Sequence, residues 1–227
     1  HCLSAFSFQR GASTALELFE RAKALGYRAL AITDECSFAG LVRGLEASEA
    51  TGLPLVCGTE VQLADGPTLV LLVETTRGYE RLSALITTAR RRAAKGSYAL
   101  HRADLEAAFD EGGEGGDHGV FALWLPTRDD LGLGAAPDVR DAAASTAAWL
   151  VAWLRARFPD RLWLAAQLHR GADDDARRAA IAALAAHSGL PVVACGDVHM
   201  HLRRRRGLQD VLCALRHRAT LREAGRR

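Results

Sequence analysis

The sequence has few cysteines and no pairing pattern among them. The five cysteines are an odd number and lie far apart, at Cys2, Cys36, Cys57, Cys195 and Cys213. No CxxC pair occurs, so neither a zinc ribbon nor a disulfide framework is indicated. Cys36, Cys57 and Cys195 lie in or beside apolar runs, and we therefore expect reduced, buried thiols in a cytoplasmic protein.

Long apolar runs, a charge excess and the common nucleotide motifs are missing too. No apolar stretch approaches the ~18 residues that span a bilayer, and no signal peptide is present, so no membrane partner is expected. The 29 Lys and Arg nearly balance the 27 Asp and Glu, which argues against nucleic-acid binding by the whole surface. No GxSxG, P-loop or Rossmann motif occurs, and Cys36 has no obvious base that would make it a nucleophile.

What the sequence does have is enough apolar residues for one sizeable core. It contains 227 residues, of which 49% are hydrophobic, and this suits a single α/β domain. The chain begins at His1 without a methionine and ends on LREAGRR directly after a helical pattern. We therefore expect residues 1–227 to be one domain cut from a longer protein.

Helical and strand patterns alternate along the chain. Thr14 and Glu17 have the spacing of a capping box, Leu16, Phe19 and Ala22 supply an apolar face, and Gly26 is a stop signal. The acidic and glycine-rich segment 111–119 is expected to be a flexible surface loop without chemistry. The expected helices are 13–26, 38–51, 78–95, 103–109, 138–158, 173–189 and 205–217, and the expected strands are 27–33, 53–63, 67–75, 119–126, 161–168 and 191–199, with a hairpin turn at 64–66.

Polar residues stand where several of these strands end. Strand–helix alternation with continuous apolar runs favours a mainly parallel sheet that is buried on both faces. In a βα barrel the carboxyl ends of the strands meet on one face, where active sites are built, and this favours a barrel over an open sheet. The residues expected there are His1, Asp34, Glu60, Asp197 and His199.

These side chains are the ligand types of a zinc or manganese site. Imidazoles and carboxylates bind both metals, and a bridging carboxylate can hold two ions ~3.5–4 Å apart. Asp197 and His199 can serve one ion only if the strand breaks there, which Gly196 would permit. The alternative is that strand-end acids and histidines cap helices or bond loop backbone. The candidates are His1, Glu60, Asp197 and His199, with Asp34, Glu35 and His201 as marginal ones.

Several motifs together resemble a known family. HCLSAFSFQRGAS, ALAITDECSFAG, GTE, GYERLSALIT and ACGDVHMHLRRRRGLQDVLCALR are similar to the PHP (polymerase and histidinol phosphatase) domain. The closer resemblance is to the N-terminal PHP domain of bacterial error-prone C-family DNA polymerases. It implies a distorted seven-stranded, TIM-like βα barrel with its first strand truncated, and, where intact, a trinuclear zinc or manganese site for phosphoester hydrolysis. By position, His1 matches the leading histidine, Glu60 the bridging glutamate, and Asp197 and His199 the closing D-x-H.

The sequence departs from the family pattern at several ligand positions. Leu3 stands where the first motif has its second histidine, and Arg10 stands where polymerase relatives place an acid. Glu35 replaces a histidine, Thr68 occupies another histidine position, and 124–126 (Trp-Leu-Pro) offers no ligand. A trinuclear cluster needs about nine ligands, at roughly three per ion, and too few candidates remain. At most one weakly bound Zn²⁺ or Mn²⁺ ion is expected.

Arg10 brings a fixed positive charge into a site that would otherwise hold cations. We hypothesise that its guanidinium pairs with Glu60, Glu35 or Asp197 and substitutes for one metal ion. Tight binding of two or three metal ions per chain at neutral pH would contradict this.

The functional expectation follows from the resemblance. It is the PHP domain of an error-prone polymerase for damage-induced translesion synthesis, with Mg²⁺ serving the parent polymerase, no catalytic residue in this domain, and a degenerate metal site. Its expected partners are the polymerase core of the same chain, DNA through the parent protein, and mutagenesis accessory proteins. The alternatives are an active metal-dependent phosphoesterase or 3′–5′ exonuclease, and a DNA-contacting module that uses Arg203, Arg204, Arg205 and Arg206. Such short basic runs, including 90–92, are more often solvated.

Overall fold

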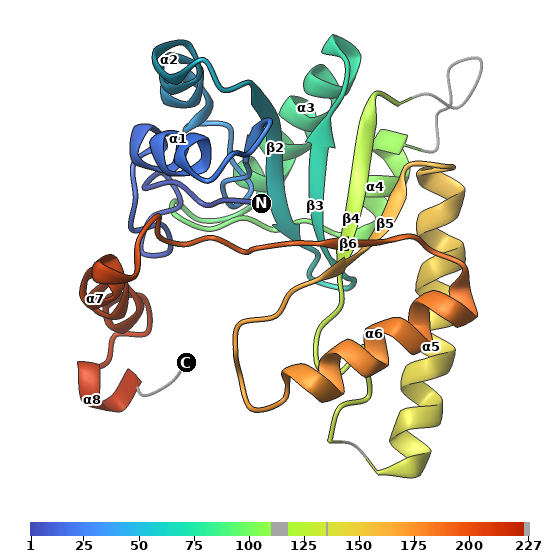
Figure 1. The fold of residues 1–227 in the computed structure, drawn as a ribbon. Helices are drawn as coiled ribbons and strands as arrows, with labels where there is room; N and C mark the ends of the chain where they lie inside the picture. Colours follow the sequence, from blue (N-terminus) through green and yellow to red (C-terminus); the bar gives the residue numbers. More distant parts are fainter. Residues whose placement is uncertain (110–117, 135, 225–227) are drawn as a thin grey trace. The chain divides into compact units, whose positions relative to one another are not determined.

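The computed structural model describes residues 1–109, 118–134 and 136–224. The chain divides into two compact units, one formed by His1–Glu60 with Asp197–Arg227 and the other by Val61–Gly196. The glycine-rich segment expected to be a surface loop lies mostly outside the described residues. Figure 1 shows the elements in chain order.

The first unit combines the two ends of the described chain. Its hydrogen-bonded strands are β1 and β2, which run parallel with Leu30 opposite Leu55. β2 crosses the boundary and ends in the second unit. The elements are α1 (Ala15–Ala24), β1 (Leu30–Ile32), α2 (Leu41–Thr51), β2 (Leu55–Gln62), the 3₁₀ helix η1 (Arg203–Arg205), α7 (Arg206–Arg216) and α8 (Leu221–Ala224).

Local signals fix the ends of α1 as the sequence predicts. The Thr14 hydroxyl accepts a hydrogen bond from the Glu17 amide, the Glu17 carboxylate accepts one from the Thr14 amide, and Gly26 has a φ of 78°. The expected apolar face is corrected at one position. Phe19 and Ala22 are buried as expected, but Leu16 is exposed. The buried face consists of Ala15, Leu18, Phe19 and Ala22, which recur at helical spacing, and position 16 lies outside this face.

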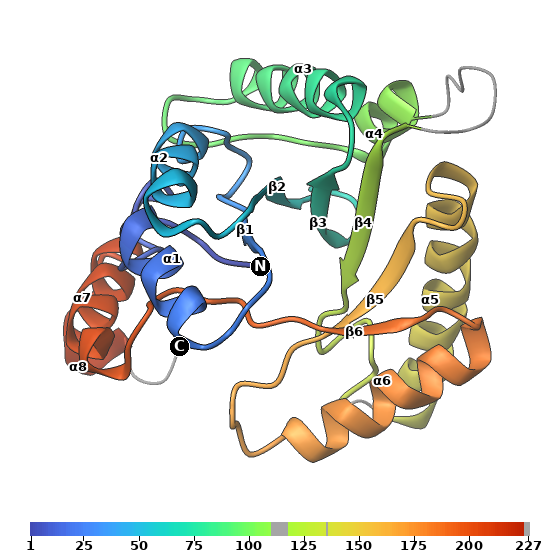
Figure 2. The same cartoon turned by 45° about the horizontal axis from the view of Figure 1, so that its top comes forward.

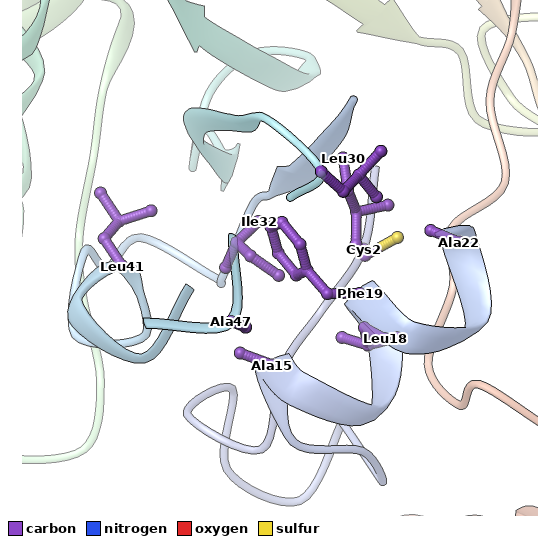
Figure 3. Close-up of a cluster of buried hydrophobic side chains, with 10 residues drawn as sticks. Cys2, Ala15, Leu18, Phe19, Ala22, Leu30, Ile32, Leu41 and Ala47 are labelled. Atoms are coloured by element: carbon purple, nitrogen blue, oxygen red, sulfur yellow. The ribbon is translucent and has the colours of Figure 1, made fainter. Parts of the chain in front are cut away.

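Figure 3 shows the hydrophobic core of this unit. Phe19 and Ile32 are fully buried at its centre, between α1 and β1. Each such side chain contributes roughly 1.5–3 kcal/mol relative to an exposed one. The cluster comprises Cys2, Ala15, Leu18, Phe19, Ala22, Leu30, Ile32, Leu41, Ala47 and Leu53, with Val198 packed against it.

Where the sequence predicts a truncated first strand, the structure has isolated β-bridges at Cys2. Cys2 forms parallel bridges to Ile32 on one side and to Val198 on the other. The Leu3 amide donates to the Val198 carbonyl at 2.9 Å, and the Thr33 amide donates to the Cys2 carbonyl at 2.9 Å. This single residue therefore holds β1 beside the segment that carries Asp197 and His199.

The described part of the second unit contains the strands β3 to β6 and the helices α3 to α6. β3 pairs antiparallel with β4, and β4, β5 and β6 are parallel to one another. Trp124 of β4 is fully buried, while Val70 and Leu125 belong to a cluster with Ala165. The elements are β3 (Thr68–Val73), α3 (Thr76–Arg92), α4 (Arg102–Phe109), β4 (Val120–Leu125), α5 (Pro137–Arg157), β5 (Leu162–Ala166), α6 (Asp174–Ser188) and β6 (Val192–Ala194).

The α/β class and the chain order of elements agree with the sequence prediction. The described residues form six strands in the order β1-β2-β3-β4-β5-β6, one fewer than the seven expected, and Cys2 makes only isolated bridges. The expected hairpin joins β2 to β3 across 63–67. None of the helices in the described ranges combines the length and apolar character that crossing a bilayer requires.

Candidate metal centre

Three expected ligands come together in the first unit. His1 Nε2 lies 2.8 Å from Glu60 Oε2 and 4.0 Å from Asp197 Oδ1. Among the described residues, His1, Glu60 and Asp197 form the one group of potential ligands whose atoms all lie within 4.8 Å of one another. The His1 side chain is fully buried and Glu60 nearly so.

A second histidine–carboxylate pair adjoins this group. His199 Nε2 lies 3.0 Å from Asp197 Oδ1, and Gln209 Nε2 of α7 lies 3.2 Å from His199 Nδ1. Gln209 thus engages the far nitrogen of the ring, and this holds the imidazole in place. All four main candidates from the sequence are therefore neighbours.

The backbone places these side chains differently from the simple strand-end picture. Glu60 lies inside β2, before its end at Gln62. β6 stops at Ala194, and the left-handed backbone conformation falls on Asp197, with a φ of 44°, and not on Gly196. A non-glycine residue in this region is uncommon, and the strain is consistent with a site that fixes the direction of its carboxylate.

Arg10 occupies the centre of the acidic cluster. Its Nη1 donates to Glu60 Oε1 at 2.6 Å and lies 3.0 Å from Glu35 Oε2. The side chain of Arg10 is 14% exposed, so solvent screens these pairs only partly. Arg216 of α7 lies 3.8 Å from the same oxygen of Glu35.

The pKa shifts follow from burial and this charge arrangement. Burial opposes ionisation of Glu60, but the hydrogen bond from His1 and the charge of Arg10 outweigh it and lower its pKa. Burial also opposes the charge on Asp197, yet His199 holds its pKa at about 2. Burial disfavours the Arg10 cation, and Glu60 followed by Glu35 overcomes this and raises its pKa.

Asp34 is engaged in holding a loop. Its Oδ1 accepts from the Ser4 amide at 2.8 Å and from the Ser7 hydroxyl at 2.7 Å, and its Oδ2 accepts from the Ser4 hydroxyl at 2.7 Å. Asp34 is buried, and a Cβ added at Gly40 would lie only 2.2 Å from its Oδ2. These hydrogen bonds attach residues 4–7 to the loop that follows β1. Residues 4–7 lead directly to Arg10 in the chain, so the bonds help to position Arg10.

The remaining expected positions lie apart from the ligand group. Leu3 is fully buried. His201 Nδ1 lies 2.8 Å from the Ser13 hydroxyl. Thr68 and Trp124 belong to the second unit, where Thr68 bonds Gln62.

The basic residues of the DNA-contacting alternative lie in η1 and at the start of α7. Arg205 pairs with Glu17, and Arg206 lies 3.8 Å from Asp210. Arg203 and Arg204 are exposed. In the run 90–92, Arg92 makes a bidentate pair with Asp104 at 2.6 and 2.7 Å. Part of the basic character is thus used within the fold.

The donor set fits one divalent ion better than three. His1, Glu60 and Asp197 offer the nitrogen and oxygen ligands that Zn²⁺ and Mn²⁺ accept. Formally, Glu35, Glu60 and Asp197 carry three negative charges against the two positive charges of Arg10 and Arg216, which leaves one negative charge. Glu60 Oε1 already faces a guanidinium, and the Leu3 side chain has no ligand atom.

Sequence reasoning missed the contribution of α7. Gln209 and Arg216 are seven residues apart, so both lie on one face of the helix, and this face meets His199 and Glu35. The spacing was visible in GLQDVLCALR, but a helical pattern alone does not say which neighbour it meets.

Comparison with known proteins identifies relatives of the chain. The PHP domain family matches residues 1–152, a range that spans the boundary between the two units. The error-prone DNA polymerase of Pseudomonas savastanoi pv. phaseolicola is 54% identical over 225 residues, 99% of this chain and 20% of that protein. The error-prone DNA polymerase of Xanthomonas axonopodis pv. citri is 52% identical over 225 residues, again 99% of this chain and 19% of that protein. The chain therefore spans about a fifth of the length of these relatives.

Two solved structures share the fold at low identity. An amidohydrolase from Chromobacterium violaceum, with bound sulfate and no metal, has a TM-score of 0.56 at 17% identity and covers 88% of this chain and 86% of its own. A protein from Bifidobacterium adolescentis assigned as a metal-dependent phosphoesterase has a TM-score of 0.50 at 19% identity, with coverages of 89% and 87%. The family match, with His1, Glu60, Asp197 and His199 brought together, leads to one conclusion: the chain belongs to the PHP domain family.

Proposed function

We propose that this chain is the N-terminal PHP domain of an error-prone DNA polymerase that copies damaged DNA. The support is the identity of 54% over nearly the whole chain to such a polymerase. On this proposal residues 1–227 form one domain with a distorted TIM-like barrel, the parent protein is cytoplasmic, and it uses Mg²⁺ for nucleotidyl transfer. Its partners are the polymerase core of the same chain, DNA, and mutagenesis accessory proteins.

The domain itself is proposed to be structural, with a degenerate metal site. The observation that carries this is the Arg10 guanidinium, which contacts both Glu60 and Glu35 where a cation cluster would lie. A guanidinium supplies positive charge but has no open coordination position, so it cannot activate a water molecule as a metal ion does. Arg10 thus balances the acids without supplying hydrolytic chemistry.

A single ion remains compatible with the other donors. His1, Glu60 and Asp197 would hold it, with His199 oriented beside them by Gln209. Such an ion would supply Lewis-acid chemistry. His1, Glu60 and Asp197 would position the ion, and burial of the His1 side chain would keep water away from its ring. Because the Arg10 guanidinium competes with the ion for Glu60, we expect the metal ion to bind weakly.

The test uses the parent polymerase. Purified protein should extend a primer past a damaged template base with Mg²⁺, contain at most one weakly held Zn²⁺ or Mn²⁺ by elemental analysis, and show no 3′–5′ exonuclease activity. Two or more tightly bound ions together with exonuclease activity would instead favour the phosphoesterase alternative.

An Asp197→Asn variant locates any exonuclease that is detected. Activity that disappears in this variant comes from the PHP site, whereas activity that persists comes from elsewhere.

Replacing the exposed Arg203 and Arg204 by alanine tests the DNA-contacting alternative. That alternative predicts weaker, less salt-dependent DNA binding, and unchanged binding would contradict it.

A further inference from the structure

Helix α7 carries an apolar stripe that the described structure leaves exposed. Leu208, Val211 and Leu215 follow one another at intervals of three and four residues, so they lie in one line along the helix. Their exposed fractions are 42%, 41% and 57%. In a surface helix of a globular protein, such a stripe ordinarily faces the core.

The orientation of α7 is fixed by its other faces. Gln209 contacts His199, Arg216 lies beside Glu35, and Ala214 is buried. Arg205, at the end of η1, pairs with Glu17 of α1. Figure 2 shows α7 and α8 as the last two helices of the chain. Turning the helix to bury Leu208, Val211 and Leu215 would therefore break the contacts to the candidate metal centre. The exposed stripe is a consequence of how α7 serves that centre.

Under the proposed function, a large part of the parent protein lies outside this structure. The polymerase of Pseudomonas savastanoi aligns with 99% of this chain, and the aligned part is 20% of that polymerase. That relative is therefore about five times longer than this chain. The polymerase core is expected after residue 227, and α7 and α8 are the last described elements. A segment tethered there is held at high effective concentration near the stripe.

We propose that Leu208, Val211 and Leu215 form the docking surface for the polymerase core of the same chain. The inference rests on the proposed function and deepens it by naming the surface. Three apolar side chains in line suit a partner groove or helix of apolar character. A partner docked on this stripe would contact the same helix whose Gln209 and Arg216, on another face, contact His199 and Glu35.

The surroundings of the stripe specify the partner further. Between positions 203 and 223 the sequence has seven arginines against two acids, Asp210 and Glu223. The matching surface of the core should therefore be an apolar patch with an acidic rim. A DNA backbone would satisfy the arginines but would leave the leucines and the valine without apolar contacts.

The experiment measures thiol labelling in the full-length polymerase. Leu215→Cys and, separately, Val211→Cys are treated with a maleimide, and the modified peptides are quantified by mass spectrometry. Val42→Cys is the matched control, because Val42 is also a helical apolar residue and is 69% exposed. We expect the two stripe positions to react at least about tenfold more slowly than position 42, because labelling requires the interface to open.

Each outcome has a defined meaning. Labelling of 211 and 215 as fast as 42 would overturn the docking surface. Fast labelling that becomes slow only when primer–template DNA is added would assign the stripe to DNA and also overturn it. Primer extension is measured on the same samples. A full-length protein that extends no primer contradicts the proposed function, whereas one that extends primers and labels quickly at 215 contradicts the docking surface alone.

Discussion

At the scale of single residues, the candidate centre depends on one cation that belongs to the chain. Arg10 lies against Glu60 and Glu35, while Asp197 and His199 form a separate pair. Removing one member of a partly buried charge cluster leaves the others uncompensated, which costs more than the pair contributed.

Replacing Arg10 by alanine should destabilise the chain and make it bind metal. Without a counter-charge, Glu35 and Glu60 repel each other and Asp197, and we expect a loss of about 3 kcal/mol in the free energy of unfolding. Mn²⁺ or Zn²⁺ should restore part of this loss by binding to the vacated carboxylates. Urea unfolding with EDTA and with Mn²⁺ measures both effects.

Arg43→Ala is the control for that experiment. Arg43 also pairs with a glutamate, Glu46, but both side chains are more than half exposed. Its urea midpoint should stay near that of the unchanged protein and should not respond to Mn²⁺. Equal behaviour of the two variants would contradict a special role for Arg10.

A substitution at Gly40 tests whether Asp34 holds the loop that carries Arg10. A methyl group at this position would approach Asp34 Oδ2 to 2.2 Å and Ser4 Oγ to 2.8 Å, so Gly40→Ala must disturb the hydrogen bonds of Asp34. We expect a loss of about 1–3 kcal/mol, the cost of leaving buried polar groups unsatisfied. Gly207→Ala in α7 meets nothing within 4 Å and should instead stabilise by up to about 1 kcal/mol. Thermal melts of the two variants should therefore shift in opposite directions.

At the scale of elements, local sequence signals predicted helices better than they predicted contacts. Thr14, Glu17 and Gly26 marked the ends of α1 correctly, because caps depend on neighbours in the chain. The role of Gln209 depends on which helix face meets His199, and that is set by packing. The left-handed conformation of Asp197 was likewise not predictable, because only the folded surroundings hold a non-glycine residue there.

The ion pair between Arg92 of α3 and Asp104 of α4 should make the free energy of unfolding depend on pH. Hydrogen bonds from Arg92 lower the pKa of Asp104, and the His101 amide adds to this. A carboxyl group whose folded pKa is lowered contributes stability above its unfolded pKa, about 3.9, and loses it as pH falls through the folded pKa. Asp104→Asn should thus lower the urea midpoint at pH 7, and the difference should shrink below about pH 4.

The expected size of that difference is small. The Arg92 side chain is 41% exposed, so solvent screening keeps the contribution of the pair small. Urea unfolding series at several pH values measure the gap between the two proteins. A gap that widens as the pH falls would contradict the assignment.

At the scale of the whole molecule, the family match places the chain among the PHP domains, and on the proposed function its metal site is degenerate. The four candidate ligands expected from the sequence do lie together, and this part of the centre was predictable from their expected strand-end positions and the family resemblance. That Leu3 and Thr68 occupy ligand positions of the family stays a prediction from the resemblance. The ion pair that fills the centre was a hypothesis with three possible partners for Arg10, and its geometry required the fold.

Chelation should therefore leave the melting temperature of the chain nearly unchanged. A bound ion stabilises in proportion to the logarithm of its concentration over its Kd, and a weak site is largely empty at trace metal concentrations. We expect a shift of no more than about 1 °C between EDTA and untreated samples in differential scanning calorimetry. A drop of several degrees would reveal a tightly held structural ion.

The contact of Arg10 with Glu60 also has a consequence for how the protein is made. A metal centre matures only after the chain has met its ions, and its occupancy follows the supply of the cell. The guanidinium is delivered during translation, in a fixed ratio of one per chain, before Glu35 and Glu60 are even synthesised. On the proposed role of Arg10, a newly made chain can complete this part of its fold without waiting for any ion, and a cell starved of zinc or manganese would produce it no more slowly.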